Sequence, residues 1–170
     1  MNAHLKNIAN LIPTQIRDTA YVRLWALRKV PLLGWVRPQI LELTDQKTVV
    51  KIPLNRRTKN HLNSMYFGVL ACGADTAGGL IAVRQIAESG EKISLIFKDF
   101  KAEFLKRPED DTIFTCNDGS IIKEMIEETI KSGERVNRTV HVVATCPKTF
   151  DDEPVAKFAL TLSLKLKKER

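Results

Sequence analysis

The stretch at residues 66–79, YFGVLACGADTAGG, is the most apolar and most glycine-rich part of the 170-residue chain. Asp75 is its one charged residue, and no other Asp, Glu, Lys or Arg occurs between Asn60 and Val83. A helix that is apolar on nearly all sides must be enclosed by the rest of its fold. The stretch therefore predicts a buried central helix that carries a single carboxylate.

The segments around this helix predict a sheet. Residues 36–43 and 48–54 flank the turn sequence TDQK and predict a hairpin. Four later segments alternate apolar and polar residues, namely 93–108, 111–116, 135–147 and 153–168. An amphipathic helix lies between them, with Asn117 or Asp118 as its N-cap and Gly133 as its C-cap. We predict an α+β hot-dog fold, in which about six antiparallel strands wrap the central helix.

The first third of the chain has helical periodicity. An apolar residue recurs every three or four positions at Ile8, Ile12, Ile16, Ala20, Leu24 and Leu27. Pro13 is expected to split this region into two helices, and Pro31 to end the second. We interpret residues 1–32 as a helical segment packed on a hot-dog domain at 33–168. The alternative is a basic amphipathic helix that lies on a membrane surface.

The composition of the chain limits the classes of partner that we expect it to bind. The chain has 27 Lys and Arg against 20 Asp and Glu, a formal net charge of +7, which suits an anionic ligand or surface. No motif for nucleic-acid binding accompanies the charge, so we expect no nucleic-acid partner. Scattered histidines predict no metal site, and no cofactor is expected. Three scattered cysteines indicate reduced core thiols and a cytoplasmic protein. Asp75 and four glycines argue against a transmembrane span at 65–83.

The segment NHLNSMYFGVLACGADTAGG, residues 60–79, resembles the sequence N-x-x-G-x-x-H-G-G-x-x-x-x-L-x-D-x-A of PaaI-like hot-dog thioesterases. Asn60 matches the leading Asn and Asp75 matches the acidic residue, without a gap. Asn63 stands where the family has Gly. Tyr66 stands at the family's His, and Phe67 with Gly68 at its Gly pair. The order of elements over roughly residues 33–168 is also similar to this family.

The resemblance implies hydrolysis of an acyl-CoA or acyl-carrier-protein thioester. Asp75 would act as general base or nucleophile across a subunit boundary, and the backbone N–H of Gly68 would stabilise the oxyanion, with Asn60 and Tyr66 completing the site. It therefore implies a homodimer, possibly a tetramer. The expected contacts to the substrate are Asn63, Ser64, Phe67, Thr76, Arg56 and Arg57. The coenzyme A phosphates could also meet Lys59, Arg84, Lys106 or Arg107.

The residues themselves leave alternatives open. Leu70, Ala74 and Leu80 surround Asp75 in sequence and are expected to raise the pKa of its carboxyl by desolvation, which suits a base. A structural Asp in a dimer seam is the competing interpretation. For Asn60 the alternative is a structural residue that stabilises its loop, and His61 is expected to be a solvated loop residue. A tyrosine hydroxyl cannot replace an imidazole at neutral pH, so a binding protein that no longer hydrolyses is the alternative function.

Overall fold

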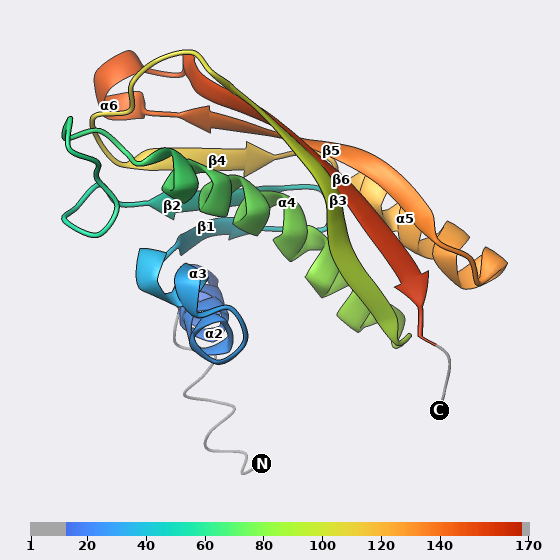
Figure 1. Cartoon of the computed structure of the whole chain (residues 1–170). Helices are drawn as coiled ribbons and strands as arrows, with labels where there is room; N and C mark the ends of the chain where they lie inside the picture. Colours follow the sequence, from blue (N-terminus) through green and yellow to red (C-terminus); the bar gives the residue numbers. More distant parts are fainter. Residues whose placement is uncertain (1–12, 168–170) are drawn as a thin grey trace, which may run out of the picture.

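The structure is a computed structural model that describes residues 13–167 (Figure 1). Its strands form one antiparallel sheet in the order β1-β2-β4-β5-β6-β3. The strands are β1 (Gln39–Leu43), β2 (Thr48–Ile52), β3 (Ile93–Phe104), β4 (Thr112–Cys116), β5 (Val136–Thr145) and β6 (Pro154–Leu166). The helices are α2 (Thr14–Lys29), α3 (Pro31–Val36), α4 (Phe67–Ser89), α5 (Gly119–Ser132) and α6 (Pro147–Phe150). The predicted α+β hot-dog fold is confirmed.

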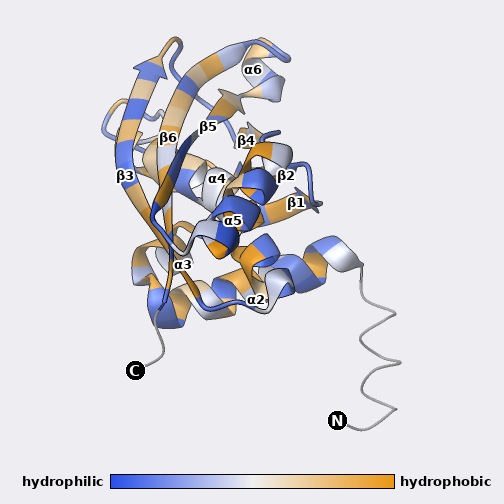
Figure 2. Cartoon of the chain, turned by 90° about the vertical axis from the view of Figure 1, so that its right-hand side faces the viewer, coloured by the Kyte–Doolittle hydropathy of each residue, from blue (hydrophilic) through white to orange (hydrophobic). Residues whose placement is uncertain are grey.

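Helix α4 lies in the concave side of the curved sheet (Figures 1 and 2). Small residues let the sheet approach it closely: a Cβ on Gly73 would lie 2.3 Å from Cζ of Phe114, whose ring is fully buried. Within residues 13–167, α4 is the one helix long and apolar enough to cross a membrane, but 61% of its most apolar window is buried inside the fold. It is therefore placed as a core helix, as the sequence predicted.

The later elements follow their sequence patterns. Along β6, alternate residues from Ala156 to Leu164 are buried, as the alternation predicted. Helix α5 begins after Asp118 and ends at Gly133, which has a φ of 69° in the left-handed region that glycine adopts without strain. The hairpin is also confirmed, since β1 pairs with β2 and Thr44 N–H donates to the Lys47 carbonyl across the turn.

The N-terminal helices differ from the prediction in their buried face. Val22 and Ala26 are the buried residues of α2, whereas Ile16, Leu24 and Leu27 are each more than half exposed. The reason is that α2 is oriented by its polar bonds to the sheet, which turn other residues inward. Pro31 ends α2 as expected but also begins α3. The predicted apolar positions Ile8 and Ile12 lie outside the described residues.

The two edges of the sheet differ in whether another part of the chain covers them. At the β1 edge, Ile40 N–H donates to Oγ1 of Thr19 at 2.8 Å, and Arg23 Nε donates to the Pro38 carbonyl at 3.0 Å, so α2 covers this edge. The β3 edge is twelve residues long, and its apolar side chains Ile96 and Phe100 are exposed. The apolar face predicted for β3 is therefore present but not buried within one chain.

Candidate functional site

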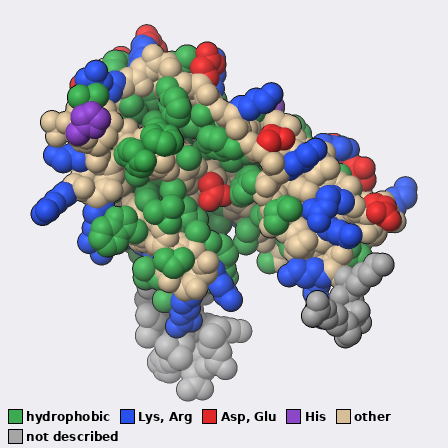
Figure 3. All heavy atoms as spheres, viewed as in Figure 1, with side chains coloured by type: hydrophobic (Ala, Val, Ile, Leu, Met, Phe, Trp, Pro, Cys, Tyr) green, Lys and Arg blue, Asp and Glu red, His purple; other side chains and the backbone are tan. Residues whose placement is uncertain are grey.

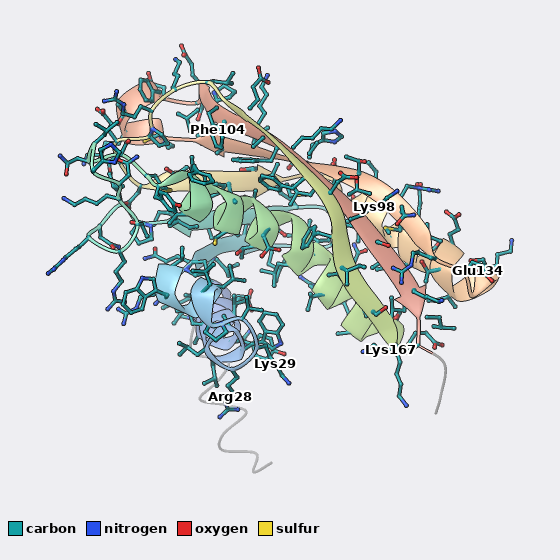
Figure 4. The ribbon with its side chains drawn as sticks, viewed as in Figure 1. Arg28, Lys29, Lys98, Phe104, Glu134 and Lys167 are labelled. Carbon is teal, nitrogen blue, oxygen red and sulfur yellow. The ribbon has the colours of Figure 1, made fainter. Side chains whose placement is uncertain are left out.

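Two clefts in the described part of the chain contain sequence-predicted site residues. The first lies at the start of α4, and we call it the helix-start cleft. It has a volume of about 300 Å³. The loop before α4 and the loop after β3 meet there, because Met65 N–H donates to the Pro108 carbonyl at 2.8 Å. Figure 4 shows Phe104 where β3 reaches the start of α4. The residues that matter for its chemistry are Asn60, His61, Ser64, Tyr66, Phe67, Lys106 and Arg107.

Asn60 holds its own loop together. Its Oδ1 accepts hydrogen bonds from Leu62 N–H at 2.9 Å, from Ser64 N–H at 3.2 Å and from the Ser64 hydroxyl at 3.2 Å. The structural role considered for Asn60 is thus present. Its amide N–H groups have no acceptor among the residues of 13–167 and remain able to donate to a ligand.

Asn63 stands where the PaaI-like thioesterases have Gly, in a backbone conformation that suits either residue. Its φ is 59°, in the left-handed region, where glycine is the usual residue and asparagine is the best tolerated alternative. Its side chain accepts a hydrogen bond from Lys59 Nζ at 2.9 Å and lines neither cleft. The position is therefore explained by the turn, and Asn63 is not placed to touch a ligand in either cleft.

The first turn of α4 offers free backbone donors. Val69 and Leu70 N–H both donate to the Tyr66 carbonyl, while the N–H groups of Phe67 and Gly68 have no backbone acceptor in the described part of the chain. A Cβ on Gly68 would lie 2.7 Å from Cε1 of Tyr66. The space that glycine leaves open by lacking a Cβ is therefore taken by the Tyr66 ring, and a substrate carbonyl could reach the Gly68 N–H only if this ring moved.

The second cleft lies along the middle of α4, and we call it the Asp75 cleft. It has a volume of about 440 Å³. Its walls come from four elements, with Tyr21 and Trp25 from α2, Leu33 from α3, Val83 from α4, and Leu95 and Phe97 from β3. Of the described residues that line it, Asp75 alone carries a charge. Figure 3 shows apolar side chains gathered on this face over α3 and α4 around an acidic group.

Asp75 is a partly buried carboxyl without a partner. Within residues 13–167 it makes no hydrogen bond or ion pair, so nothing compensates for its lost solvation. Burial accordingly raises the pKa of Asp75 to about 6, in the predicted direction. A Cβ on Gly79 would lie 3.8 Å from Oδ1 of Asp75 and 3.3 Å from Cζ of Phe97, which places the carboxylate beside Gly79 and the ring.

The sequence-predicted residues thus divide between the clefts. Asn60, Ser64, Tyr66 and Phe67 line the helix-start cleft, and Asp75 and Thr76 line the other. Ser64 and Thr76 both use their hydroxyls internally, since the Thr76 hydroxyl donates to the Cys72 carbonyl at 2.7 Å.

Of the predicted arginines, Arg107 lines the helix-start cleft, whereas Arg56, Arg57 and Arg84 line neither cleft. Arg56 is exposed, and the guanidinium of Arg57 lies over the Trp35 ring at 4.8 Å. Arg84 bonds Glu88 and Asp45 in the second half of α4. Sequence reasoning missed Tyr21, Trp25 and Phe97 as lining residues, and no local motif could have found them.

The fold is shared with several solved structures. A protein of unknown function from Chlorobaculum tepidum matches with a TM-score of 0.77 and 10% identity, over 91% of this chain and 98% of that one. A candidate thioesterase from Shewanella oneidensis matches at 0.71 and 14%, over 86% and 96%. A thioesterase from Haemophilus influenzae matches at 0.64 and 15%, over 85% and 89%. At these identities the likeness shows the hot-dog fold.

The sequence also matches a family model. Residues 19–117, more than half of the chain, match the model described as domain of unknown function DUF4442, and the chain belongs to this family. The matched region runs from α2 through β4 and contains Asn60, Gly68 and Asp75. None of the curated proteins matches the chain.

Proposed function

We propose that the protein hydrolyses the thioester of an acyl-CoA or an acyl-carrier protein. The observation that carries the proposal is Asp75, an unpartnered carboxyl with a pKa of about 6 in an apolar cleft. A carboxylate of this pKa is mostly ionised at neutral pH and is a stronger base than an ordinary aspartate. Asp75 acts as general base, taking a proton from water as it attacks, or as the nucleophile itself. Thioesterases among the structures of this fold support the assignment.

The oxyanion donor is the backbone of the first turn of α4. The N–H groups of Phe67 and Gly68 have no backbone acceptor within residues 13–167 and lie at the positive end of the helix dipole. Donors already held in place for a developing oxyanion lower the barrier without reorganisation. Asn60 adds its amide N–H, and Lys106 and Arg107 line the same cleft, where they form exposed ion pairs with Glu153 and Glu109 that an anionic ligand would have to compete with.

The complete site needs two chains. Gly68 and Asp75 are seven residues apart on α4, which is about 10 Å along the helix axis, too far for both to touch one thioester. We infer a homodimer in which the open β3 edges pair and each chain's Asp75 acts beside the partner's helix start. Its three buried, free thiols suit a cytoplasmic location.

A second candidate function is binding of an acyl thioester without hydrolysis. Two observations favour it: Tyr66 replaces the family's histidine, and its ring covers Gly68. The two candidates make opposite predictions for a hydrolysis assay on the wild-type protein.

The test is Asp75→Asn, assayed against acyl-CoAs of graded chain length. The amide keeps the shape and removes the base, so we expect a loss of at least about 10²-fold in kcat/KM. The matched control is Glu88→Gln, the same change at an exposed position of the same helix, which should stay within about twofold of wild type. Wild-type rates in Asp75→Asn would contradict the catalytic role. Tight binding by a wild-type protein that hydrolyses nothing would favour the second candidate.

Thermal melts separate lost chemistry from lost fold. The folded-state pKa of Asp75 is raised, so burying the ionised form costs stability above about pH 6. As pH falls from about 6 toward 4, the folded chain takes up a proton before the unfolded chain does, and that cost disappears. Asp75→Asn should therefore melt higher than wild type at pH 7, by about 1–3 kcal/mol in unfolding free energy, and the gap should close toward pH 4.

A further inference from the structure

The Asp75 cleft has the form of a site for a linear hydrocarbon chain. Asp75, Gly79 and Val83 stand four residues apart, so they form one row along the face of α4. The row is about 12 Å long, given eight residues at about 1.5 Å each. Tyr21 and Trp25 of α2 line the cleft opposite α4, and Phe97 of β3 lies beside Gly79.

The walls carry almost nothing that could bind a polar ligand. Besides the Asp75 carboxyl, the polar side chains lining the cleft are Thr76, whose hydroxyl already donates to a carbonyl, and Tyr21. Ligand sites of this size are usually apolar with a few fixed polar groups at the reacting end. An apolar body with one reactive group beside Asp75 is the ligand that fits.

Helix α2, which forms one wall of the Asp75 cleft, is fixed to the edge of the sheet by hydrogen bonds. Thr19 and Arg23 bond the backbone at Ile40 and Pro38 on the side of α2 that meets the sheet. Trp25 is one turn beyond Tyr21 and shares its face of α2. The face of α2 that lines the cleft therefore presents Tyr21, Val22 and Trp25, of which Val22 is buried and the two aromatic side chains are partly exposed.

We propose that the Asp75 cleft binds the acyl chain of the substrate, with the chain extended from Asp75 along Gly79 to Val83 and with α2 as the wall that sets its length. A row of about 12 Å holds an extended chain of roughly ten carbons. The substrate class is therefore a medium-length straight-chain acyl thioester. The identity of the reacting group rests on the proposed function, whereas binding of the hydrocarbon does not.

The test uses Trp25 as its own reporter. The chain has two tryptophans, so Trp35→Phe leaves Trp25 as the single emitter. The probes are straight-chain alcohols from butanol to dodecanol, whose neutral head avoids repulsion from the Asp75 carboxylate. We expect a change in Trp25 emission and an affinity that rises about three- to fourfold for each added methylene, up to a break near ten carbons.

Two variants test where the bound hydrocarbon lies in the cleft. Val83→Phe shortens the row at a partly exposed position, so the break should move to shorter alcohols. Trp25→Leu should move the break to longer alcohols. Because this variant lacks the fluorescent reporter, its binding is measured by calorimetry. The control is Leu24→Phe, on the exposed side of α2 and outside the cleft, which should leave the break unchanged.

The outcomes separate this proposal from the enzymatic one. A change in Trp25 emission without any thioester hydrolysis supports the acyl-chain site and contradicts the proposed enzymatic function. Hydrolysis whose chain-length profile is the same in wild type and Val83→Phe keeps the enzyme and overturns the chain site. A flat Trp25 response to every alcohol, as when a second copy of the chain fills the cleft, also overturns it.

Discussion

The two clefts on α4 are opposite in character. The helix-start cleft has free backbone N–H groups, the Asn60 amide and two cationic side chains, but among its described lining residues no carboxylate. The Asp75 cleft has the carboxylate and apolar walls, and the residues described around it include no free backbone donor at a helix start. One cleft suits a carbonyl and an anionic carrier, and the other suits a base and an acyl chain. Each therefore contains half of what thioester hydrolysis requires.

The sheet edges show how the halves could meet. The β1 edge is closed by the side chains of Thr19 and Arg23, whereas the β3 edge keeps a long exposed row that includes Ile96 and Phe100. An open apolar edge of this length invites pairing with another strand. Antiparallel pairing of two β3 strands in a two-fold dimer sets two α4 helices in opposite directions. The base of one chain then approaches the helix start of its partner.

The largest effect should come from breaking the β3 edge. Ile96 is 52% exposed, and Ile96→Asp places a charge where two strands would pair. We expect the mass in light scattering to fall from two chains to one, with a loss of activity of at least about 10²-fold because each site loses its second half. Leu41→Asp, at the closed β1 edge, is the control and should remain dimeric. An active monomer would show that one chain contains the whole site.

A smaller effect should follow pH. Because Asp75 acts as a base only when ionised, and because its pKa is about 6, kcat/KM should fall about tenfold between pH 7 and pH 5. The sign is opposite for a residue that must be protonated, whose activity would rise over that range. A flat profile would show that the carboxylate does not take part in the chemistry.

The smallest effect concerns Tyr66. Tyr66→His introduces, at an exposed position, the histidine of the PaaI-like thioesterases that the segment resembles, and it frees the space beside Gly68, so the rate should be unchanged or up to several-fold higher. Tyr66→Phe keeps the ring without its hydroxyl and should match wild type if the ring only packs. A tenfold loss in both variants would instead give the Tyr66 hydroxyl a direct role with the substrate.

The sequence predicted what depends on local pattern. The apolar run around Asp75 specified a core helix, the alternation in residues 153–168 specified β6, and Gly133 marked the end of α5. The raised pKa of Asp75 also followed from its neighbours. The prediction of the buried face of α2 was wrong. Apolar periodicity does not reveal that Thr19 and Arg23 bind the sheet edge and so orient the helix.

The lining of the Asp75 cleft could not be predicted from the sequence for a related reason. Trp25 and Phe97 are far apart in sequence and line one cleft because the fold brings both α2 and β3 to the part of α4 that carries Asp75. No spacing rule encodes that meeting. The space beside Gly68 could not be predicted either, because the rotamer of Tyr66 decides whether it is open.

The central claim is that one catalytic site is built from two chains, and a mixed dimer tests it directly. Gly68→Pro removes one backbone N–H in the first helical turn, and it is made in a Tyr66→Ala background because a Cβ at position 68 would otherwise lie 2.7 Å from the Tyr66 ring. Asp75→Asn removes the base. Each variant alone should lose at least about 10²-fold in kcat/KM, and Tyr66→Ala alone is the control that should stay active. A purified dimer with one chain of each kind, selected with two different tags, has one site with both groups intact. We predict roughly half of the wild-type activity for it. An inactive mixed dimer, beside an active wild-type dimer, would place Gly68 and Asp75 in the same chain's site and contradict the account.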